Sequence, residues 1–356
     1  MNFRLRDDES IPGRGTWWNP DNRFEDRSAA YEGEDAPEGP ARVPTTYLED
    51  ASQTIIARNS SPDVGFDVSI NPYRGCEHGC VYCYARPTHE YMGYSAGLDF
   101  ESVIFYKPRA AELLERELSK RSWKPEVIAM SGVTDPYQPV EREMKLARGC
   151  LEVLAKFRNP VGIVTKNRLV CRDIDILAEM AADGCAGVMI SLTTLDLALN
   201  RILEPRTSSP AQRLEAISRL SQAGIPVGVL VAPVIPAITD HEIPALLQAA
   251  RDAGARHAGY VMLRLPHAVA PLFDAWLAEH FPDRKDKVLH RIQSMRGGAL
   301  YSAEFGTRMR GTGIHADQVA HLFQVFCKRL GFQPGAWDLR TDHFRPAGGA
   351  QLELGF

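Results

Sequence analysis

Six short apolar runs, separated by amphipathic segments, constrain the fold of this 356-residue chain more than any other feature. Each run is rich in Val, Ile, Leu and Met, which is typical of parallel strands buried on both faces. The runs are Phe66–Ile70, Val127–Ser131, Val161–Thr165, Gly187–Leu192, Val227–Ala232 and Gly259–Leu265. The predicted helices are Pro108–Leu118, Glu141–Phe157, Ile174–Ala182, Ser209–Ala223, Ile243–Ala253 and Val269–His280. Because strand–helix–strand crossovers are right-handed, this series predicts an α/β fold with a parallel sheet covered by helices.

Both a doubly wound sheet and a curved, incomplete barrel satisfy this order of elements. Six units over about 200 residues fall short of the eight units of a closed barrel. In both folds the functional residues gather where the strands end and the loops begin. We therefore look for chemistry at the carboxyl ends of the predicted strands.

The two flanks of this series differ from it in composition. Residues 1–50 contain 12 acidic residues, 6 Arg and no Lys, so we expect a disordered acidic tail in which only Trp17, Trp18 and Tyr31 could dock locally. Residues 284–356 show two helical patterns, Val288–Met295 and Asp317–Leu330, and then a tail. Between Arg284 and Pro346 there are 11 Lys and Arg against 5 Asp and Glu. This stretch is either a solvated basic face or a contact surface for nucleic acid or another polyanion.

Composition excludes several classes of protein. The formal net charge is -4, so no global field draws the chain to nucleic acid or to acidic membranes. No apolar run approaches the roughly 18 residues of a membrane helix, and the N-terminus does not resemble a secretory signal. Seven Cys, three of them within eight residues, suit a metal site better than a disulfide framework. We therefore expect a soluble cytoplasmic protein in a reducing compartment, with no membrane partner.

The three clustered cysteines, directly after the first predicted strand, carry the strongest chemical signal. Cys76, Cys80 and Cys83 are spaced four and then three residues apart, so their thiolates can converge on one metal centre. Zinc would need a fourth ligand, for which His78 and His89 are the nearby candidates. A four-iron cluster on three cysteines would instead leave one iron open to a small molecule. An iron with a free coordination position indicates a catalytic site rather than a purely structural metal site.

The cysteine spacing, with Tyr82 before the last cysteine, resembles the cluster motif of the radical S-adenosylmethionine (SAM) superfamily. Further stretches resemble its spore photoproduct lyase-like, or "DNA repair photolyase", branch, closest to an uncharacterised bacterial subfamily. They are Asn71–Cys76, Thr134–Glu141, Val164–Asn167, Ile190–Thr194 and Glu204–Arg206. The resemblance implies a partial (β/α)6 barrel over residues 51–283, followed by a helical extension over residues 284–356.

The resemblance also implies a reaction class. In the superfamily a [4Fe–4S] cluster binds SAM through its open iron, and an electron from a flavodoxin- or ferredoxin-type donor cleaves the sulfonium. The resulting 5′-deoxyadenosyl radical abstracts hydrogen from a substrate. We therefore expect a lyase- or transferase-like enzyme whose cofactors are the cluster and SAM. Analogy and the basic C-terminal stretch favour a nucleic acid or nucleotide substrate, which the sequence does not identify.

Carried onto this sequence, the resemblance assigns the cluster to Cys76, Cys80 and Cys83. The residues that it implies for SAM binding are Tyr82, Ser131, Gly132, Thr134, Lys166, Ser191 and Arg206. The catalytic residues that it implies are Tyr84 and Asp135. Simpler interpretations exist: Lys166 as a surface residue, Ser191 as a helix cap and Asp135 as a turn residue before a proline.

One position departs from the family. Spore photoproduct lyases carry a hydrogen-donating cysteine just after the second strand, where this chain has Gly132. Tyr82 and Tyr84 match the paired tyrosines of the lyase cluster loop, so a radical relay through Tyr84 stays open. The thymine-dimer repair activity of the branch is therefore not carried over.

Two other classes of protein compete with this interpretation. A non-catalytic zinc or iron–sulfur module that regulates or docks a partner would need a fourth protein ligand and no polar groups at later strand ends. A barrel hydrolase would need His and carboxylate ligands at several strand ends. The strand ends instead carry Ser, Thr and Lys, which suit a zwitterionic cofactor.

Overall fold

The computed structural model describes residues 11–24, 43–335 and 337–346. Within these residues a seven-stranded sheet has the order β10-β9-β8-β7-β6-β3-β2. Its strands are β2 (Ile56–Arg58), β3 (Val68–Ile70), β6 (Ile128–Met130), β7 (Val161–Thr165), β8 (Ala186–Ser191), β9 (Val227–Val234) and β10 (His257–Met262). Neighbouring strands from β3 to β10 are parallel, and β2 pairs antiparallel with β3 at one edge.

The six parallel strands coincide with the six apolar runs predicted from the sequence. In the described part of the chain β10 and β2 are the two edges, so the sheet is open and no barrel closes. The structure thus confirms a mixed α/β fold. On one face of the central strands Ile163, Val188 and Val229 are at 0% exposure, whereas the alternate positions Gly162 and Val164 of β7 are half-buried.

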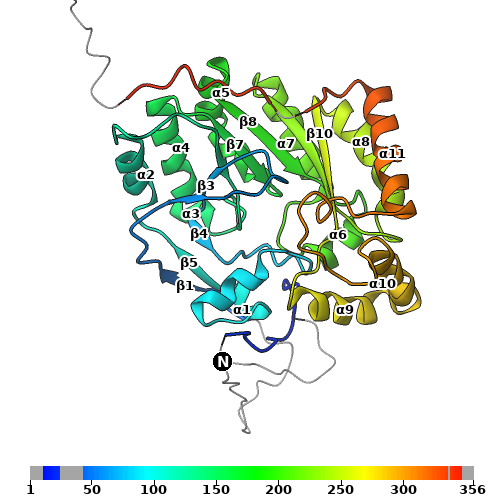
Figure 1. The fold of residues 1–356 in the computed structure, drawn as a ribbon. Coiled ribbons are helices and arrows are strands. Elements are labelled where there is room, and N and C mark those ends of the chain that lie inside the picture. The colour runs from blue at the N-terminus through cyan, green and yellow to red at the C-terminus, as the bar shows by residue number, and fades with distance from the viewer. Residues whose placement is uncertain (1–10, 25–42, 336, 347–356) are drawn as a thin grey trace, which may run out of the picture.

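The helices lie around the sheet, with α2 and α4 toward one end and α8 and α11 toward the other (Figure 1). The α-helices are α1 (Leu98–Ser102), α2 (Ala110–Leu118), α3 (Glu141–Met144), α4 (Leu146–Phe157), α5 (Ile174–Ala182), α6 (Leu197–Leu203), α7 (Pro210–Gln222), α8 (Ile243–Asp252), α9 (Val269–His280), α10 (Lys285–Ser294) and α11 (Ile314–Leu330). The 3-10 helices are η1 (Arg86–Met92), η2 (Arg168–Asp173), η3 (Asp240–Glu242) and η4 (Pro282–Arg284). The predicted helices at Ile174–Ala182 and Val269–His280 match α5 and α9 at both ends.

The helix predicted over Glu141–Phe157 is two helices, α3 and α4, and this prediction was wrong in its continuity. Lys145 between them is left-handed, with φ 54°. The carboxylate of Glu141 turns back and accepts from Ala147 N at 3.0 Å and from Arg148 N at 3.3 Å. It therefore caps the second helix through the donors that a helix start leaves open.

A second, three-stranded sheet was not expected from the sequence. It has the order β1-β5-β4 and is built from β1 (Thr46–Glu49), β5 (Val103–Tyr106) and β4 (Tyr73–Arg74). β1 pairs parallel with β5, which lies 57 residues later in the chain, as in the pair Thr46 and Val103. The prediction of a disordered tail over residues 1–50 is therefore wrong for this strand.

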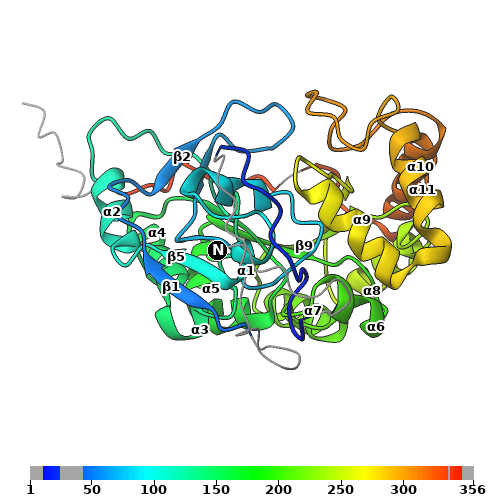
Figure 2. The ribbon, with the colours of Figure 1, turned by 90° about the horizontal axis from the view of Figure 1, so that it is seen from below.

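The tail prediction is also wrong for residues 11–24, which pack against the protein (Figure 2, dark blue). The reason is a fully buried carboxylate, Glu101, which accepts from Gly15 N at 2.8 Å, Thr16 N at 3.1 Å and Thr16 Oγ1 at 2.9 Å. Arg86, also at 0% exposure, pairs with the same carboxylate at 2.9 Å. A buried charge needs such partners, so the segment is held in place. Residues 1–10 and 25–42 of the predicted tail lie outside the described residues.

The predicted C-terminal helical patterns form α10 and α11. The stretch between these helices folds back onto the sheet, because Met262 N at the end of β10 donates to Met309 O at 2.9 Å. Arg296 Nη2 likewise donates to Leu263 O at 2.6 Å. The described helices include none that is long and apolar enough to cross a membrane.

Candidate active site

The three cysteines lie on a tight loop at the carboxyl edge of the sheet. Cys76 and Cys80 are buried, at 7% and 8% exposure, and Cys83 is half-buried. Cys83 N donates to Cys80 O at 3.2 Å, which curls the loop. Gly75 begins the loop with φ +76°, and a Cβ there would lie 2.9 Å from Phe100 O, so only glycine fits this approach. We call residues 76–83 the cluster loop.

The donor set of this loop fits an iron–sulfur cluster. All three thiols are free of disulfides, and burial raises the pKa of each one above its ordinary value. A raised pKa favours the protonated thiol, and a bound iron would stabilise the thiolate form instead. The described residues contain no group of three or more His, Cys, Asp or Glu placed to hold a single metal ion.

Neither histidine proposed as a fourth zinc ligand faces the thiols as a ligand would. His78 Nδ1 lies 3.3 Å from Asp135 Oδ2, and its Nε2 lies 3.2 Å from Asn167 Nδ2. His89 is at 0% exposure among the rings of Tyr94, Phe100 and Phe105. The geometry therefore does not favour a closed zinc site.

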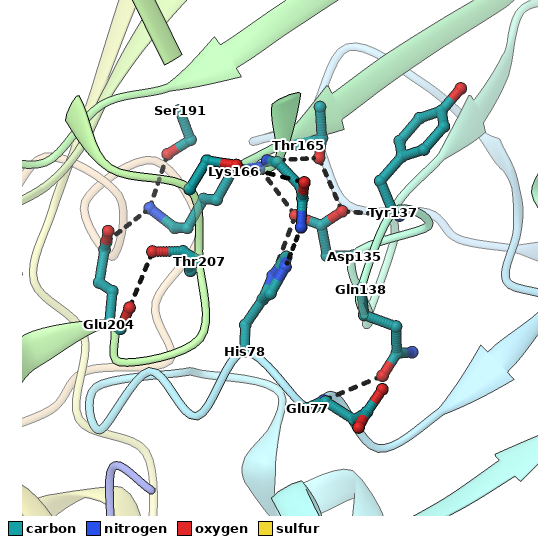
Figure 3. A network of polar contacts seen from close by, with 12 residues as sticks. Glu77, His78, Asp135, Tyr137, Gln138, Thr165, Lys166, Ser191, Glu204 and Thr207 are labelled. Atoms are coloured by element: carbon teal, nitrogen blue, oxygen red, sulfur yellow. Dashed lines mark hydrogen bonds and ion pairs between the residues drawn. The ribbon is translucent and has the colours of Figure 1, made fainter. Parts of the chain in front are cut away.

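Lys166, which directly follows β7, is the centre of a polar group at the same edge (Figure 3). Its Nζ lies 2.8 Å from Ser191 Oγ, 3.1 Å from Thr193 Oγ1 and 2.9 Å from Glu204 Oε1. The ammonium also lies 5.6 Å from the centre of the Tyr82 ring. In the sequence, Tyr82 stands between Cys80 and Cys83. Lys166, Ser191 and Tyr82 were predicted as SAM-binding residues, and the structure brings them together.

Glu204 is the buried anion of this group, at 1% exposure. It pairs with Arg213 as well as Lys166, and accepts from the hydroxyl groups of Thr193 and Tyr82. Burial alone would raise its pKa, but Arg213, Lys166 and the hydroxyl groups of Thr193 and Tyr82 together outweigh burial and hold the pKa of Glu204 well below its usual range. Glu204 lies in a motif recognised from the sequence, but its role was missed. Arg213, on α7, has no local signal that would have found it.

Asp135 holds the loops of the site in place (Figure 3). It accepts from Thr165 Oγ1 and from Lys166 N, each at 2.7 Å, and pairs with His78 at 3.3 Å. Burial opposes its ionisation, but the contacts with His78, Lys166 N and Thr165 together outweigh burial and lower the pKa of Asp135. With its oxygens bound in this way, Asp135 links the cluster loop to Lys166, and this geometry suits a positioning residue.

The stretch after β6 contains the other predicted SAM-binding residues. Ser131 has a left-handed φ of 131°, and Gly132 O accepts from Tyr84 Oη at 2.8 Å. Thr134 Oγ1 donates to Tyr73 O at 3.3 Å. A Cβ at Gly132 would lie 3.0 Å from Ser69 Oγ, so a cysteine here would require its neighbours to shift.

Arg206, another predicted SAM-binding residue, makes its side-chain contacts away from Lys166. Its guanidinium pairs with Glu77 at 3.0 Å and donates to Thr45 Oγ1 at 3.3 Å. Its backbone N donates to His78 O at 3.2 Å, so it contacts the cluster loop from another side.

Comparison with known proteins decides the family. The sequence model of the radical SAM superfamily matches residues 70–250, which include the cluster loop, Lys166 and Glu204. The chain belongs to the radical SAM superfamily. Membership supports an enzyme, and it implies SAM and an iron–sulfur cluster as cofactors.

The relatives of this radical SAM protein include an uncharacterised protein of Mycobacterium tuberculosis, 38% identical over 220 residues. That match covers 61% of this chain and 65% of the relative, so the chain spans about two thirds of its length. An uncharacterised protein of Methanocaldococcus jannaschii is 31% identical over 173 residues, covering 49% of this chain and 62% of that protein.

Solved structures of spore photoproduct lyase share the fold. A lyase complexed with dinucleoside spore photoproduct matches with a TM-score of 0.59 and 16% identity, covering 82% of each chain. A doubly substituted lyase with bound SAM and the same dinucleoside matches equally well, with a TM-score of 0.59. The likeness shows that the radical SAM protein has the lyase fold.

Proposed function

We propose that this protein is a radical SAM enzyme that holds a [4Fe–4S] cluster on Cys76, Cys80 and Cys83 and acts on a nucleic acid or nucleotide. The observation that carries the proposal is the position of the Lys166 ammonium, 5.6 Å from the Tyr82 ring of the cluster loop. When bound, the cluster and SAM would supply a 5′-deoxyadenosyl radical that abstracts hydrogen from the substrate. The six parallel strands would form the partial (β/α)6 barrel around them, and a protein of flavodoxin or ferredoxin type would supply the electron.

The residues of the chain have separate parts in this function. Lys166, supported by Ser191 and Glu204, would bind the methionine carboxylate as an ion pair. Tyr82 would pack beside the cluster and the adenine. Asp135 would fix the position of the cluster loop relative to Lys166, through its contacts with His78 and Lys166 N. Burial of these groups excludes water and strengthens their electrostatic contacts.

The substrate class rests on a second group beside the cluster loop. Arg264, two residues after β10, lies 5.3 Å from the Tyr84 ring and 6.0 Å from the Tyr301 ring. Among the described residues no carboxylate lies within ion-pair distance of Arg264, and its buried Nε has no hydrogen-bond partner. Arg296 has no ion pair there either. Burial lowers the pKa of Arg296, and the nearby charge of Arg264 lowers it further.

Aromatic faces beside guanidinium groups that form no ion pair suit a ligand with planar bases and phosphates. Tyr84 is half exposed, at 48%, and directly follows Cys83, so a base stacked on it would lie next to the cluster loop. The basic C-terminal stretch contributes Arg296 and Tyr301 to this surface. These contacts support a nucleic acid or nucleotide substrate.

Anaerobic reconstitution with iron and sulfide tests the reaction class. After reduction with added SAM, electron paramagnetic resonance should report a SAM-perturbed four-iron cluster, and chromatography should report 5′-deoxyadenosine. C80A should lose the cluster, whereas C327A, which changes a half-buried cysteine on α11, should keep it. Stoichiometric zinc without SAM cleavage would establish the binding-module alternative instead.

Binding of a fluorescent single-stranded oligonucleotide to the reconstituted protein tests the substrate class. R264Q should weaken binding about tenfold, because it removes a guanidinium beside two stacking rings. R329Q changes an arginine that also faces a ring, Phe326 at 5.8 Å, but on α11, and should leave binding unchanged. Equal affinities in both variants would exclude the Tyr84–Arg264–Tyr301 surface as the substrate site.

A further inference from the structure

An arginine-lined pocket opens beside the cluster loop, and Lys166, Ser191 and Glu204 are not among its lining residues. Its volume is about 770 Å³, and none of its twelve lining residues in the described structure is acidic. Five of the twelve are arginines, contributed by α3, η2, the loop before α7 and α7 itself: Arg142, Arg168, Arg172, Arg206 and Arg219. Asn167, Thr207, Ser208 and Gln212 add polar side chains. The lining is thus a converging set of hydrogen-bond donors with positive charge.

The ion pairs of these arginines leave donors unused. Arg172 has few donors left, because Glu141 and Asp173 accept four hydrogen bonds from its three nitrogens. Arg168 gives only Nη1 to Glu215, at 3.0 Å. Arg142 is exposed, and within the described residues its side chain has no ion pair or hydrogen bond. Since a guanidinium has five N–H donors, Arg142 and Arg168 keep most of theirs for a ligand.

We propose that this pocket binds a phosphorylated small molecule with at least two phosphate groups, such as a nucleoside diphosphate. Guanidinium groups bind phosphate bidentately, and arginines from four elements are more than one phosphate can contact. A concave site of this volume suits a small ligand better than the convex surface of a protein. Leu169 and Pro139 supply apolar lining for the part of the ligand without charge.

The pocket is joined to the cluster loop through two of its lining residues. Asn167 Nδ2 lies 3.2 Å from His78 Nε2, and Arg206 N donates to His78 O at 3.2 Å. In the sequence, His78 stands between Cys76 and Cys80. A ligand that contacts Asn167 and Arg206 would therefore contact residues that are hydrogen-bonded to the loop that holds the cluster. The proposed ligand is therefore placed to regulate the cluster site, which goes beyond the proposed function.

Isothermal titration of the full-length, anaerobically reconstituted protein with inorganic pyrophosphate tests the site directly. Wild type should bind pyrophosphate saturably, and the double variant R142Q/R168Q should bind at least tenfold more weakly. R109Q is the matched control. Arg109 is an exposed arginine with one carboxylate partner, Glu112, and it stands at the start of α2, which does not line the pocket. It should retain wild-type affinity. Titration with adenosine 5′-diphosphate and with adenosine then distinguishes a nucleotide from the phosphate groups alone.

The outcomes separate this proposal from the proposed function. Absence of saturable pyrophosphate binding, or binding that survives in R142Q/R168Q and is lost in R264Q, would overturn the pocket proposal. Loss of reduction by a flavodoxin in R142Q/R168Q, with no pyrophosphate binding in wild type, would instead assign the face to the electron donor. SAM cleavage with dithionite is measured separately, so it reports on the reaction class whether or not the pocket binds phosphate.

Discussion

Charge balance among single residues explains why Lys166 suits an anionic cofactor. Lys166, Glu204 and Arg213 form one contact group with two positive charges and one negative charge. Glu204 and Arg213 are each at 1% exposure, and the Lys166 side chain at 15%. A largely buried group with a net charge of +1 is costly without a counter-ion. A carboxylate from a bound ligand would complete it, with Lys166 as the most accessible member.

Removing the Lys166 charge should weaken SAM binding while leaving the cluster in place. In K166M we expect affinity for SAM to fall about tenfold or more, because a charge-assisted contact in a buried site is lost. Equilibrium dialysis on the reconstituted variant measures it, with K156M, an exposed lysine paired to Glu115, as the control. Wild-type affinity in K166M would remove this residue from the cofactor site.

The residues that could be predicted are those whose signal is local. Cys76, Cys80 and Cys83 lie within one stretch of eight residues. Lys166 and Ser191 lie at the ends of strands β7 and β8. Arg213 could not be found in this way, because it lies within the amphipathic helix α7 and meets Glu204 only in the folded protein. Asp135 was predicted as a catalytic residue, but its contacts with His78, Thr165 and Lys166, which join two other segments of the chain, form only in the folded protein.

At the scale of elements, the same distinction separates the two sheets. The six parallel strands of the large sheet lie in apolar runs, a composition typical of buried parallel strands. β1, β4 and β5 have two to four residues each, and their pairing joins segments far apart in sequence. Periodicity over so few residues carries little information, so this sheet could not be predicted.

The segment of residues 11–24 should contribute measurably to stability. Deleting residues 1–24 removes three hydrogen bonds to the buried carboxylate of Glu101 and leaves Arg86 as its ion-pair partner. We expect the free energy of unfolding to fall by roughly 2–4 kcal/mol, the cost of a poorly satisfied buried charge. Urea titration followed by circular dichroism measures it. Deletion of residues 1–10 alone is the control and should have little effect; equal stabilities of the two truncations would contradict the anchoring role.

For the whole molecule, the packing around His89 predicts how stability depends on pH. His89 joins η1 to the rings of Phe100 and Phe105, and so ties the second sheet to the cluster-loop region. Burial lowers its pKa to about 3, whereas the unfolded chain has a histidine pKa of about 6.5. Between these values the unfolded state binds one more proton than the folded state. The stability from neutral His89 is therefore fully present above pH 6.5 and is lost as pH falls toward 3.

Lowering the pH from 6.5 to 4.5 should thus cost about 2–3 kcal/mol through this residue alone. Urea midpoints of wild type and H89Q across this range isolate the effect. Loss of the cluster and protonation of the carboxyl groups change the stability of both proteins equally. H89Q should be less stable at pH 7 and have the shallower pH slope. H290Q, which changes an exposed histidine on α10, should keep the wild-type slope. Parallel slopes for wild type and H89Q would mean that His89 takes up its proton without unfolding, and that the packing around it is looser than the structure shows.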